Sequence, residues 1–238
     1  MRPPLDIVYQ DDDLAVINKP SGLLVHRSRI ANEAREFAMQ MLRDQIGQHV
    51  YPVHRLDRPT SGLLIFALSS EIATKMSESF ATSQVKKQYH AVVRGYLPGE
   101  GTVDYPLKEE LDKIADAQAD KDKEAQEAVT HFRCLEKVEL PFKVSKKHDT
   151  TRYSLVELTP ETGRKHQLRR HMAHLRHPII GDTNHGDGRH NRFFREYFDS
   201  HRLLLAATGV EFKHPISGEA ISLTVPLPGE FLKAFQVD

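Results

Sequence analysis

The stretch VHRLDRPTSGLLIFALS, Val53 to Ser69, joins a compact charged turn to a continuous run of apolar residues. The apolar run, Leu63 to Leu68, is too short for a free-standing helix and is typical of a buried strand. Pro59 disfavours the helical conformation for the residue before it, so the turn is expected to stay extended. The sequence therefore predicts a charged loop, centred on Asp57, that the following strand fixes to the core.

Two arginines flank Asp57 in this loop, Arg55 before it and Arg58 directly after it. Nearby cations favour the charged form of a carboxyl group, so we expect Asp57 to stay ionised. An Asp in a turn can also simply hydrogen-bond to its own backbone, and for an isolated Asp before Pro-Thr-Ser-Gly this structural interpretation is at least as good. The complete stretch is more specific than an isolated turn.

HRLDRPTSG followed by an apolar strand resembles the central motif of the RluA-type pseudouridine synthases, in which the Asp of H-R-L-D is catalytic. Four further stretches resemble family motifs in the same order: NKPSGLLVH from Asn18, KKQYHAVVRG from Lys86, TGRKHQLRRHMAHLRHPIIGD from Thr162 and RLLLAA from Arg202. The resemblance covers nearly the whole chain, from about Ile7 to Pro226. One departure is Ala206, where the family usually has a histidine.

This resemblance implies an isomerase that detaches a uracil already in RNA from its N1 bond and reattaches it through a carbon, with no cofactor. Asp57 would start glycosidic cleavage as nucleophile or base, Tyr89 would stack on the target base, and Arg169 would keep the carboxylate charged. Two points stay open: whether the carboxylate attacks the sugar or the ring, and whether Tyr89 accepts a proton. Further contacts with RNA are expected from His54, Arg55, Arg58, Arg164, Lys165 and Arg170, of which the first two could instead hold the loop.

Within the family, the wording is closest to a branch that modifies tRNA, notably in HRSR, RDQIGQHV and EELDKIAD. The resemblance thus implies tRNA as the partner and uridine 65 of the T stem as the target. Two alternatives remain: a family member that acts on ribosomal RNA, and a catalytically silent RNA-binding protein.

Length and composition predict a single catalytic domain over residues 1–238, because a chain of this size can bury a core without disulfide bonds or structural metal ions. The first expected strand begins almost at Met1, so no RNA-binding extension is expected before it. The only cysteine, Cys134, excludes an internal disulfide and fits a reducing compartment. No stretch has the length of a signal peptide or a bilayer span, so we expect a cytoplasmic protein with no membrane and no obligate protein partner.

The formal net charge of zero argues mildly against a nucleic-acid partner. Opposite charges are, however, segregated along the chain. Residues 99–128 hold ten acidic side chains against four lysines, and residues 163–202 hold nine basic side chains against four acidic ones. A basic surface is therefore compatible with a neutral chain, although a charge run is usually just a solvated face.

Periodicity predicts the α+β class, with a mixed, mainly antiparallel sheet, flanking helices and a central cleft. Helices are expected over Glu33–Ile46, capped by Asn32, after Ser69 or Ser70, and over His166–Leu175. The segment Lys108–Glu127 is rich in Ala, Asp, Lys and Glu and is expected to be a surface excursion. Strands are expected over Leu5–Tyr9, Leu14–Asn18, Leu63–Leu68, Tyr89–Tyr96, Ala128–Leu140, Arg152–Thr159, Leu203–Thr208 and Ala220–Val225.

Two rival chemistries are less well supported. His166, His171, His174 and His177 crowd one expected helix and its exit, and spacings of three put the last three near one face. No H-E-x-x-H motif accompanies them, so histidines interleaved with arginines on an RNA-facing helix are favoured over a metal site. A serine hydrolase is weaker still, because Ser61 lies in T-S-G and not in G-x-S-x-G.

Overall fold

The computed structural model of the protein describes residues 2–26, 36–109 and 124–237. Contacts divide the chain into two compact units. Unit 1 consists of Met1–Lys87, Lys108–Ala125 and Ala207–Val225, and unit 2 consists of Gln88–Leu107, Gln126–Ala206 and Pro226–Asp238. Neither unit is a continuous stretch of sequence, and the single catalytic domain stays a prediction.

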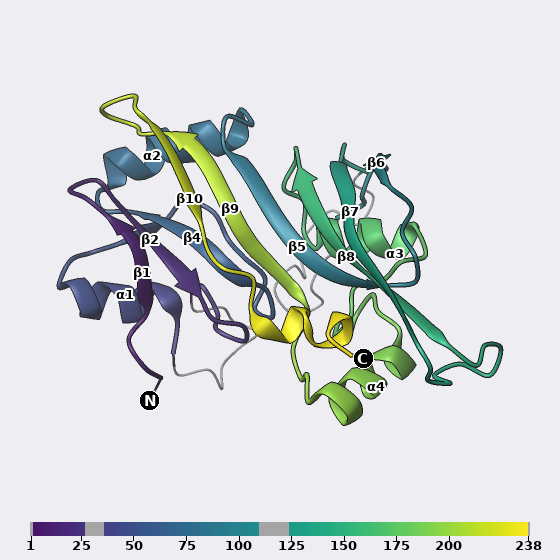
Figure 1. Cartoon of the computed structure of the whole chain (residues 1–238). Helices are drawn as coiled ribbons and strands as arrows, with labels where there is room; N and C mark the ends of the chain where they lie inside the picture. The colour runs from purple at the N-terminus through teal and green to yellow at the C-terminus, as the bar shows by residue number, and fades with distance from the viewer. Residues whose placement is uncertain (1, 27–35, 110–123, 238) are drawn as a thin grey trace. The chain divides into compact units, whose positions relative to one another are not determined.

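Unit 1 contains strands in the order β1, β2, β4 and β9, with β3 also paired to β4 and β10 to β9 (Figure 1). The β1–β2, β2–β4, β3–β4 and β9–β10 pairs are antiparallel. Strand β9 begins in unit 2 and enters unit 1 at Ala207. The bounds are β1 Asp6–Gln10, β2 Leu14–Lys19, β3 Tyr51–Pro52, β4 Ser61–Ala67, β9 Leu205–Lys213, β10 Ala220–Thr224, α1 Ala38–Ile46 and α2 Ser70–Ala81.

Strand β4 is the centre of unit 1, and every one of its residues is buried. Its apolar side chains pack with those of β2, α2 and β9, including Leu14, Met76 and Phe212. Helix α2 begins directly after the strand because the Ser69 hydroxyl accepts a hydrogen bond from the backbone N–H of Ile72 at 3.3 Å. The buried strand and the serine cap predicted from the sequence are both confirmed.

Unit 2 has the strand order β5, β8, β7 and β6, and these pairs are antiparallel. Successive side chains of a strand point to opposite faces, and β5 shows this directly. Ala91 and Val93 pack with α3, whereas Val92 packs with α4. The bounds are β5 Lys86–Arg94, β6 Glu100–Asp104, β7 Val129–Leu140, β8 Thr151–Pro160, α3 Gln167–His174, α4 Gly188–Phe198 and the 3₁₀ turns Gly229–Phe231 and Lys233–Phe235.

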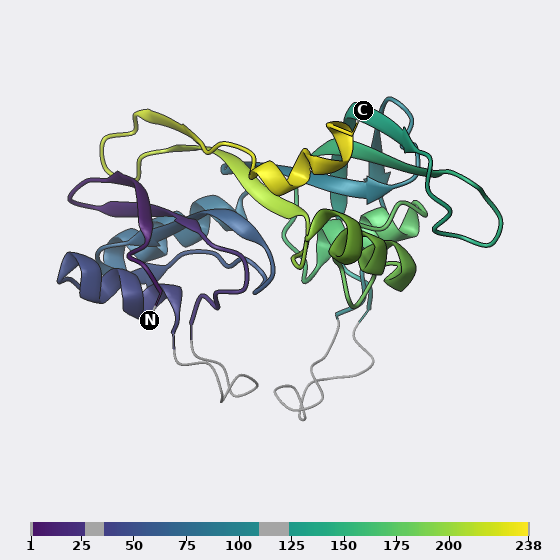
Figure 2. The same ribbon diagram turned by 60° about the horizontal axis from the view of Figure 1, so that its bottom comes forward.

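The tip of the β7–β8 hairpin and helix α4 lie at the same end of unit 2 in both ribbon views (Figures 1 and 2). Helix α4 was not predicted from the sequence. Its side chains Phe194 and Phe198 fill the core of unit 2 next to Ala206, which is 1% exposed. The position at which the family usually has a histidine is therefore a packed core position in this chain.

The other expected elements are confirmed with changes at their ends, the largest being the later start of α1 and the end of β9 at Lys213 in place of Thr208. The α+β class with its mainly antiparallel sheet is correct. Helix α1 begins at Ala38, and the residue before it is Phe37, which is extended and gives no side-chain cap, so the expected start at Glu33 with Asn32 as the cap is wrong. Asn32 itself lies outside the described residues, as does most of the acidic excursion. Helix α3 begins one residue after His166, which takes a left-handed conformation with φ 55°. None of the helices in the described ranges is long and apolar enough to cross a membrane.

Gly62 in β4 is one of the few positions where only glycine fits. Its φ is 109°, and a Cβ placed there would lie 2.0 Å from the carbonyl oxygen of Ala207. We expect Gly62→Ala to lower the free energy of unfolding by at least about 3 kcal/mol, because both the backbone strain and the clash must be relieved. Urea unfolding of the two proteins measures this difference.

Gly163→Ala is the matched control, because a Cβ at Gly163 meets nothing within 4 Å. It is expected to change the free energy of unfolding by less than about 1 kcal/mol. Equal stability of the Gly62 variant and the wild type would contradict this account of β4.

Candidate active site

The loop that carries Asp57 is fastened to a second turn in unit 1, the one after β2. The Lys19 side chain is fully buried, and its Nζ donates to the carbonyl oxygens of Leu23 at 2.8 Å and of Arg58 at 3.3 Å. The Gly22 N–H donates to the same Arg58 carbonyl at 2.8 Å, and the Arg58 Nε donates back to the Gly22 carbonyl at 3.2 Å. The two sequence motifs around Lys19 and Asp57 thus form one hydrogen-bonded assembly.

Asp57 itself is half-buried in this assembly, at the start of a tight turn. Its carbonyl oxygen accepts a hydrogen bond from the Thr60 N–H at 3.0 Å, and Leu56 beside it is buried. The Ser21 hydroxyl donates to the Pro59 carbonyl at 2.7 Å on the other side of the turn. The backbone around the carboxylate is therefore held from several directions, which suits a group that must keep one position during a reaction.

His54 points into unit 1, where its ring stacks on Phe80 with 4.6 Å between the ring centres. Its Nε2 accepts a hydrogen bond from the backbone N–H of Ile65 in β4 at 3.0 Å. Burial, together with the charge of Lys87, lowers the pKa of His54 to about 3, so the ring is neutral near pH 7. The sequence left two roles open for His54, contact with RNA and holding the loop. These contacts support the second role, and contact with RNA stays a prediction.

Tyr89 lies on β5 in unit 2, directly opposite Leu158 of β8. Its ring packs at the edge of the core cluster that contains Leu168 and Met172 of helix α3. Leu168 is the residue before Arg169, so one cluster brings the strand of Tyr89 and the helix of Arg169 together. Two of the three predicted catalytic residues thus belong to unit 2, whereas Asp57 belongs to unit 1.

Arg169 forms a buried, two-pronged ion pair with Asp182. Its Nε lies 2.7 Å from Asp182 Oδ2 and its Nη2 lies 2.8 Å from Asp182 Oδ1. The side chains of Arg169 and Asp182 are only 5% and 1% exposed. Such a pair fixes the plane of the guanidinium, because both nitrogens are held at once.

Asp182 is itself held by the loop that follows it. The backbone N–H groups of Asn184 and His185 donate to its Oδ1 at 2.9 and 3.0 Å. Burial by itself would raise the pKa of the Asp182 carboxyl, but the hydrogen bonds from Arg169 and from the backbone, together with the charge of Arg169, lower it below its ordinary value. Asp182 is the last residue of the motif that begins at Thr162, but no role was predicted for it.

Asn191 of helix α4 holds the backbone of the loop that carries Asp182, the partner of Arg169. Its side-chain amide donates to the Asp182 carbonyl at 2.7 Å and accepts from the Gly181 N–H at 2.8 Å. The unpredicted helix therefore fixes the loop that positions Arg169. No pattern around Asn191 could have shown this, because its partners lie about ten residues back in the chain.

The other residues expected to contact RNA are divided between the units. Arg55 and Arg58 are exposed in unit 1. Arg164 is exposed in unit 2 and donates from Nε to the Glu127 carbonyl at 3.0 Å, while Lys165 and Arg170 are half-buried there. Their contacts with RNA stay predictions.

The four histidines considered for a metal site are used by the protein in different ways. His166 lies with its Nδ1 3.1 Å from Nε2 of His185. His171 is buried, with Nδ1 2.9 Å from the Thr130 hydroxyl and Nε2 3.0 Å from the Tyr105 carbonyl. His174 stacks on the Tyr105 ring, and His177 lies beyond the end of α3 with Nδ1 2.8 Å from the Arg94 carbonyl. In the described ranges, no three His, Cys, Asp or Glu side chains are grouped as a metal ion requires.

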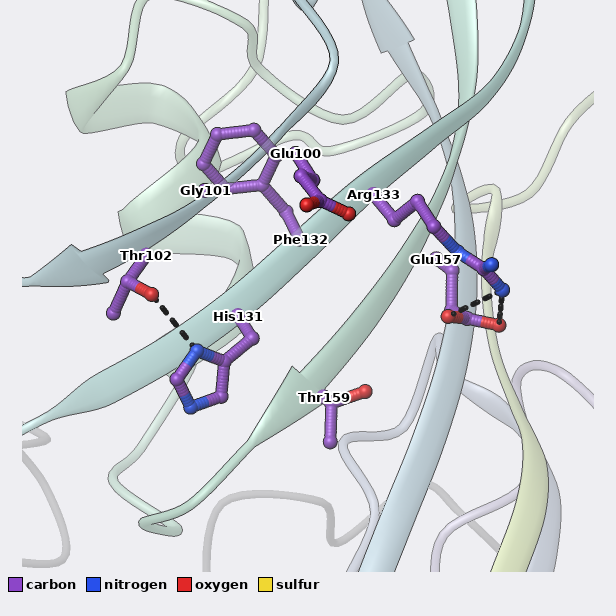
Figure 3. Close-up of a pocket in the computed structure, with 8 residues that line it drawn as sticks. All are labelled: Glu100, Gly101, Thr102, His131, Phe132, Arg133, Glu157 and Thr159. Atoms are coloured by element: carbon purple, nitrogen blue, oxygen red, sulfur yellow. Dashed lines mark hydrogen bonds and ion pairs between the residues drawn. The ribbon is translucent and has the colours of Figure 1, made fainter.

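A shallow cavity of about 360 Å³ lies on strands β6, β7 and β8 of unit 2 (Figure 3). Its polar groups pair with one another: Thr102 with His131 at 2.8 Å, and Arg133 with Glu157 at 3.0 Å. Glu100 adds a second carboxylate, so acidic groups balance or exceed the basic ones. These paired cross-strand neighbours resemble a solvated sheet face more than a reaction site.

Residues 13–174 match the family model described as RNA pseudouridylate synthase. The chain belongs to this family. It is 60% identical over 223 residues to tRNA pseudouridine synthase C of Vibrio cholerae, and the aligned region covers 94% of this chain and 91% of that protein. It is 57% identical over 231 residues to tRNA pseudouridine synthase C of Vibrio parahaemolyticus, and the aligned region covers 97% of this chain and 94% of that protein.

The fold is also similar to two solved structures of the family. Human RNA Pseudouridylate Synthase Domain Containing 1 has a TM-score of 0.72 and 25% identity, with 96% of this chain and 87% of that chain covered. Human RNA Pseudouridylate Synthase Domain Containing 4 has a TM-score of 0.68 and 28% identity, with 95% and 90% covered. The α+β assignment thus rests on these likenesses as well as on the strand order.

Replacing Asp182 by asparagine tests the support of Arg169. Asp182→Asn keeps the size of the side chain but removes the charge opposite a buried guanidinium and turns one of the two acceptor oxygens into a donor, so we expect the free energy of unfolding to fall by about 3 kcal/mol at pH 7. Because the folded-state pKa of Asp182 is lowered, its contribution is complete above the ordinary Asp value and is lost as the pH falls through the lowered one. The difference between the proteins should therefore shrink in acid.

Urea unfolding at several pH values measures this effect. Asp149→Asn is the control, because the Asp149 side chain is 88% exposed and pairs with Lys143 at the surface. A loss from Asp182→Asn no greater than that from the control would show that the ion pair does not stabilise unit 2.

The neutral state of His54 also predicts that the free energy of unfolding depends on pH, here because the folded protein disfavours the charged form of the side chain. The unfolded chain takes up a proton near pH 6.5, whereas the folded protein does so only near pH 3, so stability is lost as the pH falls below 6.5. We expect His54→Gln, whose side-chain oxygen can still accept from Ile65, to reduce the slope of unfolding free energy against pH by up to about 1.4 kcal/mol per pH unit.

Denaturant unfolding between pH 7 and pH 4.5, as ~0.5 unit steps, gives this slope. His148→Gln, at an exposed position, should leave it unchanged. Identical slopes for the wild type and the His54 variant would show that His54 titrates as it does in the unfolded chain.

Proposed function

We propose that this protein is a tRNA pseudouridine synthase that isomerises one uridine of tRNA to pseudouridine, with uridine 65 of the T stem as the target. The observation that carries the proposal is the identity of 57% over 97% of the chain with a protein named tRNA pseudouridine synthase C. The family match over residues 13–174 also includes Asp57, Tyr89 and Arg169. We propose the cytoplasm as the place of action, because tRNA, the proposed substrate, is present there.

Asp57 is the proposed nucleophile or base. The reaction conserves all atoms of the nucleotide apart from one exchanged hydrogen. The bond between the sugar and N1 breaks and a bond from the sugar to a ring carbon forms. The hydrogen of that carbon leaves to water as a proton, and N1 takes up a proton in its place. A carboxylate can begin this sequence either by attack or by removal of a proton. The rigid turn around Asp57 supports the proposal because a reacting group gains from a fixed position.

Tyr89 and Arg169 have supporting roles in this proposal. The Tyr89 ring would stack on a base that has left the RNA helix, and its half-buried place at the edge of a core cluster leaves a surface for such a contact. Arg169 would supply positive charge to the Asp57 carboxylate. The ion pair with Asp182 supports this, because it holds the guanidinium in one orientation.

Tritium release tests the proposed role of Asp57. With tRNA labelled on the ring carbon that forms the new bond, the wild type should release tritium, and Asp57→Asn should lower the rate by at least about a thousandfold. Asp12→Asn, the same change at an exposed position of unit 1, should keep the wild-type rate. Equal turnover by the wild type and Asp57→Asn would refute the assignment.

Two measurements separate the proposal from its alternatives. Binding of tRNA by Asp57→Asn shows that the variant is folded, and binding without turnover by the wild type would indicate a silent RNA-binding protein. Mapping of pseudouridines in total tRNA and ribosomal RNA, with and without the gene, identifies the target. Loss of a modification in ribosomal RNA alone would assign the enzyme to that substrate.

A further inference from the structure

A second cavity of unit 2, of about 780 Å³, lies between the end of β5, the tip of the β7–β8 hairpin and the start of α4. We call it the basic pocket. Its size is in the range of pockets that hold ligands. The basic pocket is lined by Arg94, Gly95, Tyr96, Ser145, Lys146, Lys147, His148, Thr150, Thr151, Arg152, Arg189 and His190.

Positive charge dominates the lining of the basic pocket. Five of the lining residues are Arg or Lys and none is Asp or Glu. Two carboxylates pair with cations of the lining: Asp187 is 2.6 Å from Arg94, and Glu139 is 3.1 Å from Arg152, whereas Asp149, beside the lining, pairs with Lys143 at 2.7 Å. Subtracting both still leaves three positive charges in excess, which must be balanced by solvent ions or by an anionic partner.

The excess charge comes from Lys146, Lys147 and Arg189. In the part of the chain that the structure describes, neither lysine forms an ion pair, and both lie on the hairpin tip. Arg189 is 62% exposed, and its Nε lies 3.6 Å from an Asp187 carboxylate that Arg94 already binds more closely. These three cations are therefore available to an anion from outside.

The basic pocket differs from the cavity in Figure 3, which lies in the same unit. There, Arg133 pairs with Glu157 at 3.0 Å, Thr102 bonds to His131 at 2.8 Å, and Glu100 adds a second carboxylate. Unit 2 thus does not expose positive charge everywhere. Five cations line the basic pocket, where three separate elements of unit 2 meet.

The pocket also offers an aromatic surface. Tyr96 is 37% exposed, and the Arg152 guanidinium lies 5.0 Å from the centre of its ring. Exposed aromatic rings and arginine planes beside cations are features with which proteins bind the bases and phosphates of RNA. A site for a small anionic metabolite would enclose its ligand with buried cations. The excess cations of the basic pocket lie at the surface.

We propose that the basic pocket binds phosphates of the RNA substrate and is a second contact, separate from the residues proposed for the reaction. Arg94 lies five residues after Tyr89 on β5, which is about 17 Å at about 3.3 Å per residue. The phosphates bound here therefore belong to nucleotides at a distance from the target base. This inference rests on the proposed function, because that function supplies RNA as the polyanion.

A triple variant tests the proposal: Lys146→Ala, Lys147→Ala and Arg189→Ala in the full chain. Filter binding with unmodified tRNA gives the Kd, and single-turnover tritium release at saturating enzyme gives the rate of the reaction. We expect the Kd to rise at least about tenfold near 0.15 M salt, and the slope of log K against log salt to become shallower by about 2 to 3, since each lost phosphate contact removes about 0.7 to 0.9. The rate at saturation should stay at the wild-type value.

The matched control removes the same charge elsewhere: Lys137→Ala, Arg195→Ala and Lys213→Ala, all at exposed positions outside the pocket. An increase in Kd no larger than that of this control would overturn the proposal. So would a pocket variant that loses binding of inorganic phosphate while its tRNA affinity is unchanged, because the pocket would then belong to a small anion.

The two proposals fail in different ways. If the wild type binds tRNA tightly but releases no tritium, the proposed reaction is wrong, and the Kd comparison still decides the role of the basic pocket. If turnover is normal and the two triple variants bind tRNA equally, the reaction stands and the pocket assignment falls.

Discussion

The buried ammonium group of Lys19 is the contact on which the arrangement around Asp57 depends. A lysine with no exposed surface must bring its charge to strong acceptors, and Lys19 does so through the carbonyl oxygens of Pro20, Leu23 and Arg58. Two turns that are distant in sequence become one rigid assembly because they share this cation. The Asp57 loop owes its fixed position to this contact and to the buried strand β4 that follows it.

Arg169 in unit 2 is positioned by a similar device with the opposite sign. There, the buried carboxylate of Asp182 gathers a guanidinium and two backbone N–H groups, and Asn191 secures the loop from helix α4. Buried ion pairs of this kind contribute more to orientation than to net stability, since desolvation offsets much of their attraction. In both units, a buried charge supports a residue proposed to act on RNA.

Much of the fold could be predicted from local pattern. The continuous apolar run of β4, the serine before α2 and the glycine after α1 each act through neighbouring residues, so the sequence displays them directly. Helix α4 escaped because its buried face includes the polar residues His190 and Asn191, which interrupt the apolar stripe that marks a helix. Its cap, Asp187, was the one local signal.

The candidate site could be predicted only in part, for the same reason. The motif residues Asp57, Tyr89 and Arg169 were identified by resemblance, but their partners Lys19, Asp182 and Asn191 act through contacts between separate segments. For His54 the sequence left open RNA contact and a loop-holding role, and its inward orientation depends on Phe80 and Ile65. The periodicity of apolar residues shows which face of a single helix or strand is buried. It carries no information on contacts between segments that are distant in sequence.

Strand β9 also affects how the chain can reach this state. Val210 and Phe212 belong to the same core cluster as Leu14 and Val16, so the first strands of unit 1 cannot be covered until a segment near the other end of the chain has been synthesised. Contacts between such distant parts of a chain slow folding. On the ribosome, the nascent N-terminal segment must therefore wait with apolar surface uncovered, and chaperones that shield such surface would be most useful for this protein before β9 emerges.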